Sequence, residues 1–324
     1  MSLQVQVATS VTQTHLVSLA PFSGSIYGGT YPNGRLYKYV PGTGWSTIIF
    51  NQFLAETSIR ALLEFEGVLY GGTYPNCKLL RYDIPTSLWV QVCDNLNAQS
   101  SVSLTMAIFE SRLYAGTWNG GRLFRLNAGK TAWEQMCAQY GSETIITGLQ
   151  VYDGNLYAGT SPGGRLLKLN AGKTAWDLVC GQFGAETSIY SLGIHNRRLY
   201  ACTSPTNKLL VLNENKNAWV QVCARYGAET AGRGVNSLFG NLFTSGITSG
   251  NIQVKNRAGL NWTCTALPLG TNVAYSDIVQ GQELFYGQSP NTAYLFQVTG
   301  LPVERYQLIN GLFKRKMKQR FNNN

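Results

Sequence analysis

The sequence predicts an all-β chain folded as a seven-bladed β-propeller of four-stranded antiparallel blades. Three observations support this fold class. A short block returns every 42 to 44 residues along the 324-residue chain. Each repeat holds four short apolar or alternating segments separated by turn residues, and the phase of the repeat places the start of the chain inside a blade. A fixed period of this length is typical of units that must stack on their neighbours to bury their apolar faces.

The repeated block reads SIYGGT at its first occurrence and RLYACT at its fifth. Its endpoints are Thr30, Thr73, Thr117, Thr160 and Thr203, followed by the degenerate equivalents Gly246 and Gln288. A tryptophan follows about sixteen residues after most endpoints, at Trp45, Trp89, Trp133, Trp176, Trp219 and Trp262. Because these tryptophans recur at one position of an outer strand, we expect them to fill the contacts between blades.

The third repeat shows the four strands of one blade. Residues 102–109, 113–117, 122–127 and 132–137 are apolar or alternating segments, and Gly, Asn and Lys-containing turns separate them. This order predicts an antiparallel meander.

The seventh repeat predicts how the ring closes. It supplies strands near 273–280, 283–288 and 293–298, but its fourth strand is missing. Counting back from the first repeat reaches residues 2–7, whose sequence SLQVQV is similar to the outer strands WVQVC. We therefore expect residues 2–7 to complete the last blade, so that residues 1–300 form one propeller and 301–324 a separate basic tail.

Composition excludes several other classes. Only 13% of residues are charged, the net charge is +10, and no run of eighteen apolar residues predicts a membrane span. No secretory signal is recognisable, which favours a cytoplasmic or virion location over secretion. Four cysteines stand four residues after a repeat tryptophan, at Cys93, Cys137, Cys180 and Cys223. Their wide spacing predicts buried free thiols rather than disulfides or a zinc site.

The glycine, tyrosine and tryptophan positions of the first two repeats resemble the Kelch repeat. The second repeat has a double glycine at 71–72, then Tyr82 and Trp89, and the first has the pair 28–29, Tyr39 and Trp45. The resemblance implies a propeller fold. In repeats three to five, Ala-Gly or Ala-Cys replaces the double glycine and leucine replaces the tyrosine.

Catalytic signals are scarce. The chain has two histidines, His15 and His195, and no nucleophile elbow, phosphate loop or metal-ligand spacing. Both histidines are interpreted as structural. The sequence therefore predicts no metal, no cofactor and no enzymatic activity.

Charges recur at two positions of the repeat. Cations stand five residues after the repeat threonine, at Arg35, Lys78, Arg122, Arg165 and Lys208. Carboxylates stand ten or eleven residues after the tryptophan, at Glu56, Glu143, Glu186 and Glu229, with Gln99 in the remaining slot. Two interpretations stay open: an anion-binding ring, or a circle of polar contacts between blades. The nearly matched opposite charges favour the polar contacts.

Three aromatic residues break the regularity of the repeat. Tyr31, Tyr74 and Trp118 directly follow the repeat threonine in the first three repeats, where later repeats have serine. Aromatic residues beside cations are typical of protein interfaces, and aromatic faces also stack on sugars. We predict a partner-binding surface here, together with Arg35, Lys78 and Arg122. The alternative is that these aromatics only cover blade edges.

The last 24 residues hold six basic residues and one acidic residue. Their basic cluster predicts a docking segment for nucleic acid, an acidic partner or an anionic surface, and a solvated tail is the alternative. The cluster consists of Lys314, Arg315, Lys316, Lys318 and Arg320.

Taken together, these features predict a binding or assembly module that presents one propeller face to a protein partner, with a glycan as a second ligand class. The alternative is a structural or receptor-binding component of a virus particle or phage tail, which rests only on low charge and on duplicated copies such as NAGKTAW.

Overall fold

The computed structural model of the protein describes residues 3–9, 15–40, 44–45, 51–93, 99, 101–225, 227–238, 241–248, 252–255, 263–266, 273–280, 283–289 and 294–299. All regular elements in these ranges are β-strands, and the paired strands run antiparallel. The predicted all-β antiparallel class is therefore confirmed. The basic tail from residue 301 onward, including Lys314, Arg315, Lys316, Lys318 and Arg320, lies outside the described residues.

Five of the sheets have four strands each. The first contains β2 (His15–Phe22), β3 (Ser25–Tyr31), β4 (Leu36–Val40) and β5 (Gly44–Trp45). The second contains β6 (Ser58–Phe65), β7 (Val68–Tyr74), β8 (Leu79–Asp83) and β9 (Leu88–Cys93). The third contains β18 (Ser188–His195), β19 (Arg198–Ser204), β20 (Leu209–Leu212) and β21 (Trp219–Cys223). The fourth contains β22 (Gly232–Leu238), β23 (Asn241–Gly246), β24 (Ile252–Lys255) and β25 (Thr263–Ala266).

The fifth four-stranded sheet joins the two ends of the described chain. It contains β26 (Val273–Gln280), β27 (Glu283–Ser289) and β28 (Tyr294–Thr299), with β1 (Leu3–Thr9) beside β28. Leu3 lies opposite Thr299 in an antiparallel register. The N-terminal strand is thus the fourth strand of the sheet that ends the repeat array.

The remaining sheet has eight strands. Its two meanders are β10 (Ser101–Phe109), β11 (Arg112–Trp118), β12 (Leu123–Leu126) and β13 (Trp133–Cys137), and β14 (Ile145–Tyr152), β15 (Asn155–Ser161), β16 (Leu166–Leu169) and β17 (Trp176–Cys180). One residue pair, Trp118 opposite Ile145, joins β11 to β14.

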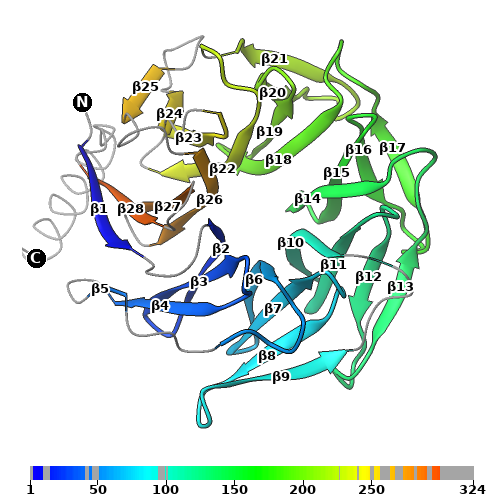
Figure 1. Cartoon of the computed structure of the whole chain (residues 1–324). Coiled ribbons are helices and arrows are strands. Elements are labelled where there is room, and N and C mark those ends of the chain that lie inside the picture. Colours follow the sequence, from blue (N-terminus) through cyan, green and yellow to red (C-terminus); the bar gives the residue numbers. More distant parts are fainter. Residues whose placement is uncertain are drawn as a thin grey trace, which may run out of the picture.

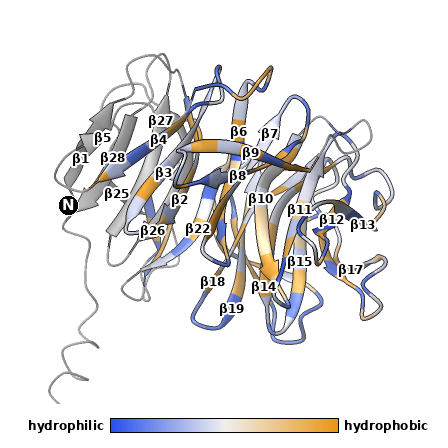
Figure 2. Ribbon diagram, turned by 90° about the horizontal axis from the view of Figure 1, so that it is seen from below, coloured by the Kyte–Doolittle hydropathy of each residue, from blue (hydrophilic) through white to orange (hydrophobic). Residues whose placement is uncertain are grey.

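The sheets are arranged around a common centre, with β2, β6, β10, β14, β18, β22 and β26 innermost (Figure 1). Neighbouring sheets bury apolar residues between them. Tyr70 and Leu79 of one sheet pack with Leu113 and Phe124 of the next, for example. In Figure 2 hydrophobic colour marks strands such as β14, whereas the turns below β18 and β19 are hydrophilic. The core is therefore a series of interfaces between sheets, as stacked repeats require.

The repeat tryptophans with described side chains belong to these interfaces. Trp89 packs with Phe22 and Tyr27 of the preceding sheet, and Trp176 packs with Tyr114 of the meander before it. Trp133 and Trp219 are placed in the same way. The expectation that these tryptophans fill contacts between blades is confirmed, while the side chains of Trp45 and Trp262 lie outside the described residues.

A repeated glycine lets adjacent meanders approach closely. Gly29, Gly72, Gly116 and Gly159 occupy equivalent places in the second strand of their meanders. A Cβ on any of them would lie 2.5 to 2.8 Å from Ile59, Val102, Ile146 or Ile189, respectively, on the next innermost strand. The fifth repeat reverses the sizes: Cys202 takes the place of the glycine, and Gly232 faces it. The glycine is therefore required by packing between sheets.

Lysines in the turns between third and fourth strands also connect neighbouring meanders. Lys130 pairs with Glu66, Lys173 with Glu110, and Lys216 with Asp153. Each ammonium group also lies 5.5 to 6.0 Å from an aromatic ring of the neighbouring meander. These partners are exposed, so each pair stabilises the fold only modestly.

The cysteines agree with the expectation of free thiols. Cys93, Cys137, Cys180 and Cys223 are free and buried, and burial raises the pKa of Cys137 and Cys180 to about 12. Such thiols behave as small apolar residues. No helix in the described ranges has the length and apolar character needed to cross a membrane.

Candidate functional site

The turn after each second strand is built on the repeat threonine. The Thr160 hydroxyl accepts a hydrogen bond from the backbone N–H of Arg165 at 3.0 Å, and the Thr160 N–H donates to the Arg165 carbonyl at 3.1 Å. The same arrangement recurs at Thr30 with Arg35, Thr73 with Lys78, Thr117 with Arg122 and Thr203 with Lys208. The threonine therefore fixes the backbone at the position of each repeated cation.

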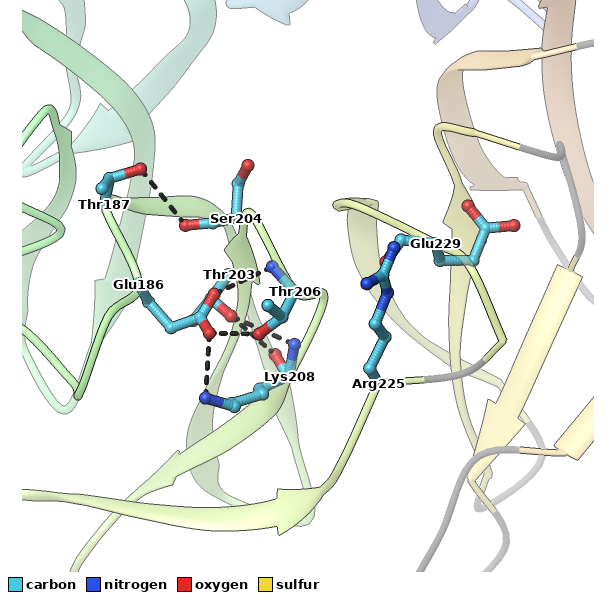
Figure 3. Close-up of polar contacts among 8 residues, drawn as sticks. All are labelled: Glu186, Thr187, Thr203, Ser204, Thr206, Lys208, Arg225 and Glu229. Atoms are coloured by element: carbon cyan, nitrogen blue, oxygen red, sulfur yellow. Dashed lines mark hydrogen bonds and ion pairs between the residues drawn. The ribbon is translucent and has the colours of Figure 1, made fainter.

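The repeated carboxylates lie beneath these turns. Glu56, Glu143, Glu186 and Glu229 are at most 1% exposed. Glu186 accepts a hydrogen bond from the Thr206 N–H at 3.1 Å and another from the Thr206 hydroxyl. It also forms an ion pair with Lys208, whose Nζ atom lies 2.9 Å away (Figure 3). Glu229 accepts from the Thr248 N–H at 2.9 Å. These carboxylates thus satisfy backbone donors of a turn as well as a cation.

The charged ring consists of pairs within one meander. Lys78 lies 3.9 Å from Glu56, and Arg165 lies 2.8 Å from Glu143. In both pairs the carboxylate precedes the innermost strand and the cation follows the second strand of the same meander. The paired arrangement agrees with the favoured interpretation of polar contacts, but the expectation that they connect different blades was wrong. The physical reason is that the carboxylate must reach the N–H groups of its own turn.

The third repeat differs from this pattern. Gln99 occupies the carboxylate slot and accepts a hydrogen bond from the Thr117 hydroxyl at 2.7 Å. Among the described residues Arg122 forms no ion pair. The charge of Lys78, in contrast, is neutralised by Glu56.

Acid titration should reveal the contribution of Glu186. Burial opposes ionisation of this carboxyl, but hydrogen bonds from Thr206, Lys208 and Thr203 together lower its pKa below the usual 4.5. The pKa of Glu186 is lower in the folded protein than in the unfolded protein. Its stabilisation is therefore fully present above the pKa of the unfolded state, and it is lost as the pH falls through the pKa of the folded state. We expect the difference in unfolding free energy between wild type and Glu186→Gln, measured by urea titration, to be constant near neutral pH and to shrink below about pH 4.5. A difference that persists unchanged at about pH 3 would contradict this.

Two of the predicted aromatic residues meet at one guanidinium. The Arg60 guanidinium carbon lies 4.7 Å from the ring centre of Tyr74 and 5.1 Å from that of Trp118. Tyr31 packs edge-on against His15, with ring centres 5.4 Å apart. Tyr31 and Trp118 are each 38% exposed. The cation between Tyr74 and Trp118 is therefore Arg60. The predicted cations of this surface were Arg35, Lys78 and Arg122.

Arg60 projects from an irregularity in its strand. In β6, Ile59 pairs with Thr73 and Ala61 pairs with Gly72, so Arg60 is an extra residue in a β-bulge. The innermost strands of the other meanders are irregular at the same place. Extra residues include Val17, Thr147 and Tyr190. Bulges re-aim side chains, and they are common next to functional sites.

Several of these extra residues line a cavity at the centre of the ring. Its volume is about 190 Å³, and β2, β6, β10, β14, β18 and β22 all line it. Val17, Thr147, Tyr190 and Arg233 belong to the lining. The Arg233 guanidinium carbon lies 5.2 Å from the Tyr190 ring centre. The cavity is consequently bordered by an arginine stacked on an aromatic residue.

The positive charge of Arg233 acts on Arg60. Burial lowers the pKa of Arg60 from its usual value, nearby tyrosines oppose this change, and the positive charge of Arg233 adds to it. Tyr74, Tyr190 and Tyr31 are the tyrosines that act on Arg60. Arg60 remains protonated at neutral pH because an arginine pKa is so high. The candidate site therefore consists of two arginines stacked on aromatic rings, Arg60 on Tyr74 and Trp118 and Arg233 on Tyr190.

The roles of Arg60, Tyr190 and Arg233 were not predicted from the sequence. The signal available was the residue that directly follows the repeated apolar position of the first strand, such as Ile59 or Ile189. That residue changes chemical class from repeat to repeat while its neighbours stay alike. Its significance depends on the bulge, which no local pattern in the sequence indicates.

Comparison with known proteins shows the fold. No protein-family model matches the chain, and no curated protein matches it significantly. A catalytically inactive virginiamycin B lyase from Staphylococcus aureus, solved with quinupristin, has a TM-score of 0.74 at 8% identity and covers 91% of this chain and 98% of its own. YCF48 bound to a D1 peptide has a TM-score of 0.66 at 14% identity, with 92% and 94% covered. YCF48 from Cyanidioschyzon merolae has a TM-score of 0.68 at 14% identity, with 93% and 99% covered.

These similarities support a β-propeller fold and correct one expectation. The exclusion of enzymatic activity does not hold, because a lyase shares this fold. At 8% identity, however, the similarity concerns the fold and carries no activity over to this chain. The comparisons give no support to Kelch membership or to a component of a virus particle.

Proposed function

We propose that the chain is a protein-binding module that presents one face of a seven-bladed propeller to a peptide segment of its partner. In this proposal the eight-stranded sheet counts as two blades, because one residue pair joins its two meanders. Residues 1–300 would then be one domain, closed by β1, and 301–324 a separate basic segment whose docking role stays a prediction.

The observation that carries this proposal is the contact of Arg60 with Tyr74 and Trp118. Stacking holds the guanidinium in place, so the surface is organised before a partner arrives. Tyrosine, tryptophan and arginine are also the residues enriched at interface hot spots. The structure of YCF48 bound to a D1 peptide supplies a precedent for peptide binding on this fold. Glycan binding has only the exposed aromatic rings in its favour.

Selection of peptides tests the proposal. A displayed peptide library is selected on the immobilised full chain, and affinities are compared with a variant carrying Tyr31→Ala, Tyr74→Ala and Trp118→Ala. We expect the selected peptides to bind this variant about a hundredfold more weakly, because it removes the aromatic hot spots.

The matched control removes three exposed apolar residues of outer strands, through Leu88→Ala, Leu178→Ala and Val220→Ala. These side chains are about 50% exposed, and the change should leave affinity unaltered. Thermal melting verifies that both triple variants are folded. Peptides that bind the aromatic variant as tightly as wild type, or a selection that enriches no binder, would refute the proposal.

A further inference from the structure

One turn of the second repeat has a leucine where equivalent turns have glycine. Four turns of the chain lead into an innermost strand and hold a buried glutamate. In three of them the residue two positions before the glutamate is a glycine with φ between 53° and 57°, namely Gly141, Gly184 and Gly227. In the second repeat this residue is Leu54, and its φ is 51°. Glycine adopts this left-handed backbone freely, whereas it is unfavourable for a residue that has a Cβ.

The same leucine is turned toward solvent. Leu54 is 70% exposed, which makes it the most exposed large apolar residue in the part of the chain that the structure describes. The other non-glycine residues with positive φ in the described ranges are polar, apart from the buried Cys77. Leu54 therefore combines an unfavourable backbone with an apolar side chain in water. Residues that carry such costs are concentrated at sites of function.

A hydrogen bond connects the turn of Leu54 to the candidate site. The N–H of Thr57, three residues after Leu54, donates to the Tyr74 carbonyl at 2.8 Å. Tyr74 in turn holds the guanidinium of Arg60, which also stacks on Trp118. The turn of Leu54 consequently adjoins the surface that Tyr74, Arg60 and Trp118 form.

Arg60 gives this surface a charge that no described carboxylate neutralises. No ion pair within the described ranges includes Arg60, and its Nε atom is buried without a hydrogen-bond partner there. Glu56, the carboxylate of the same turn region, is engaged elsewhere: it accepts from the Asn76 amide at 2.7 Å and pairs with Lys78. Arg60 is only partly buried. A stacked guanidinium of this kind is oriented to receive a planar carboxylate.

We propose that Leu54 is a contact residue of the protein-binding surface, and that the bound peptide carries an acidic and a large apolar side chain within one short segment. The carboxylate pairs with Arg60, and the apolar side chain packs on Leu54. Removal of Leu54 from water on binding offsets the cost of keeping it exposed in the free chain. This inference rests on the proposed protein-binding function and specifies the chemistry of the partner.

The composition of selected peptides tests the chemistry. A displayed library of random peptides is selected on the immobilised full chain, and the bound peptides are sequenced. We expect segments that combine Asp or Glu with Leu, Ile, Phe or Trp to be enriched at least about threefold over the unselected library. Selection on Arg60→Gln should lose the acidic enrichment, and selection on Leu54→Gly should lose the apolar enrichment.

Two substitutions of Leu54 separate contact from fold. Leu54→Gly should weaken binding of the selected peptides at least about tenfold, because it removes the buried apolar area of the complex. It should not lower the melting temperature of the free chain, since glycine accepts the φ of this turn. Leu54→Ala keeps the unfavourable backbone but shortens the side chain, and we expect a similar loss of affinity. Fluorescence anisotropy measures affinity, and thermal melting verifies that each variant, including Arg60→Gln, is folded.

Gly184→Leu is the matched control. It places a leucine on the equivalent turn of the fifth repeat, where φ is 57° and a Cβ would meet no atom within 4 Å. The fifth repeat has Ser204 in the position of Tyr74. We expect this variant to have a lower melting temperature and an affinity for the selected peptides within about twofold of wild type.

Different results would overturn the inference and the proposed function. Unchanged affinity in Leu54→Gly, or a lower melting temperature in that variant, would show that Leu54 is not a contact residue kept at the expense of stability. Selected peptides that need Tyr74 and Trp118 but lack the acidic and apolar enrichment would remove this inference and leave the proposed function standing. A labelled oligothymidylate that binds more tightly than the selected peptides, and depends on Arg60, would assign the surface to nucleic acid. A selection that enriches no peptide would refute the proposed function itself.

Discussion

Gly159→Ala is expected to destabilise the protein by about 3 kcal/mol, because the new methyl group has no room between two sheets. A Cβ at this position would lie 2.7 Å from Ile189 Cγ2 and 2.8 Å from the Ile189 carbonyl oxygen. Ile189 is fully buried, and one of the contacts is with backbone, so the clash cannot be relieved by rotating a side chain. Urea unfolding at neutral pH measures the change in unfolding free energy.

Gly148→Ala is the matched control, since it also adds a methyl group to a strand that faces the next sheet. A Cβ there would lie 3.6 Å or more from Leu192, which is ordinary contact. We expect its effect to stay within about 1 kcal/mol, with a small stabilisation from the reduced entropy of the unfolded chain. Similar unfolding free energies for the two variants would contradict the close approach of the sheets at Gly159.

Glu186→Ala is expected to lower the unfolding free energy by about 3 kcal/mol. The substitution leaves the Thr206 N–H and hydroxyl without their acceptor, and it removes the partner of Lys208. Glu186→Gln should cost less, about 1 kcal/mol, because an amide oxygen still accepts a hydrogen bond. Gln99 shows that the slot accommodates this side chain in the third repeat.

Glu134→Ala provides the comparison for an exposed pair. Glu134 lies 2.7 Å from Arg125, but the two side chains are 47% and 28% exposed. Water replaces the lost interaction there, so the expected change is below about 1 kcal/mol. Chemical unfolding of the two alanine variants under one condition measures both. A loss at Glu134 as large as that at Glu186 would show that burial is not what makes the turn network important.

The two large effects concern the scaffold, whereas function is proposed where the repeats differ. Four meanders share the glycine that packs against the next innermost strand, and four share the buried glutamate that holds their own turn. The residues of the β-bulges, in contrast, vary from valine to arginine to tyrosine. A propeller scaffold is compatible with many functions, including that of a lyase, so the proposed function depends on these variable residues rather than on the fold.

The sequence by itself determined the local organisation of the chain. Strands predicted at 102–109 and 132–137 are observed at Ser101–Phe109 and Trp133–Cys137, because alternation and turn residues are local signals. The phase of the period also indicated the pairing of β1 with β28, although 284 residues separate β1 from the start of β28. Interfacial tryptophans followed from the same regularity, since equivalent positions in stacked units have equivalent neighbours.

Only the tertiary structure decided which side chains meet at the candidate site. Tyr74 and Trp118 were recognised as exceptions, but their common partner Arg60 was not, because a bulge turns it toward them. Arg233 and Tyr190 likewise meet at the central cavity although they belong to different repeats. The structure likewise showed which groups each buried glutamate contacts, because its side chain is long enough to reach only the N–H groups of the turn in its own meander. Contacts of this kind depend on distances across strands, and a periodic pattern records spacing along the chain only.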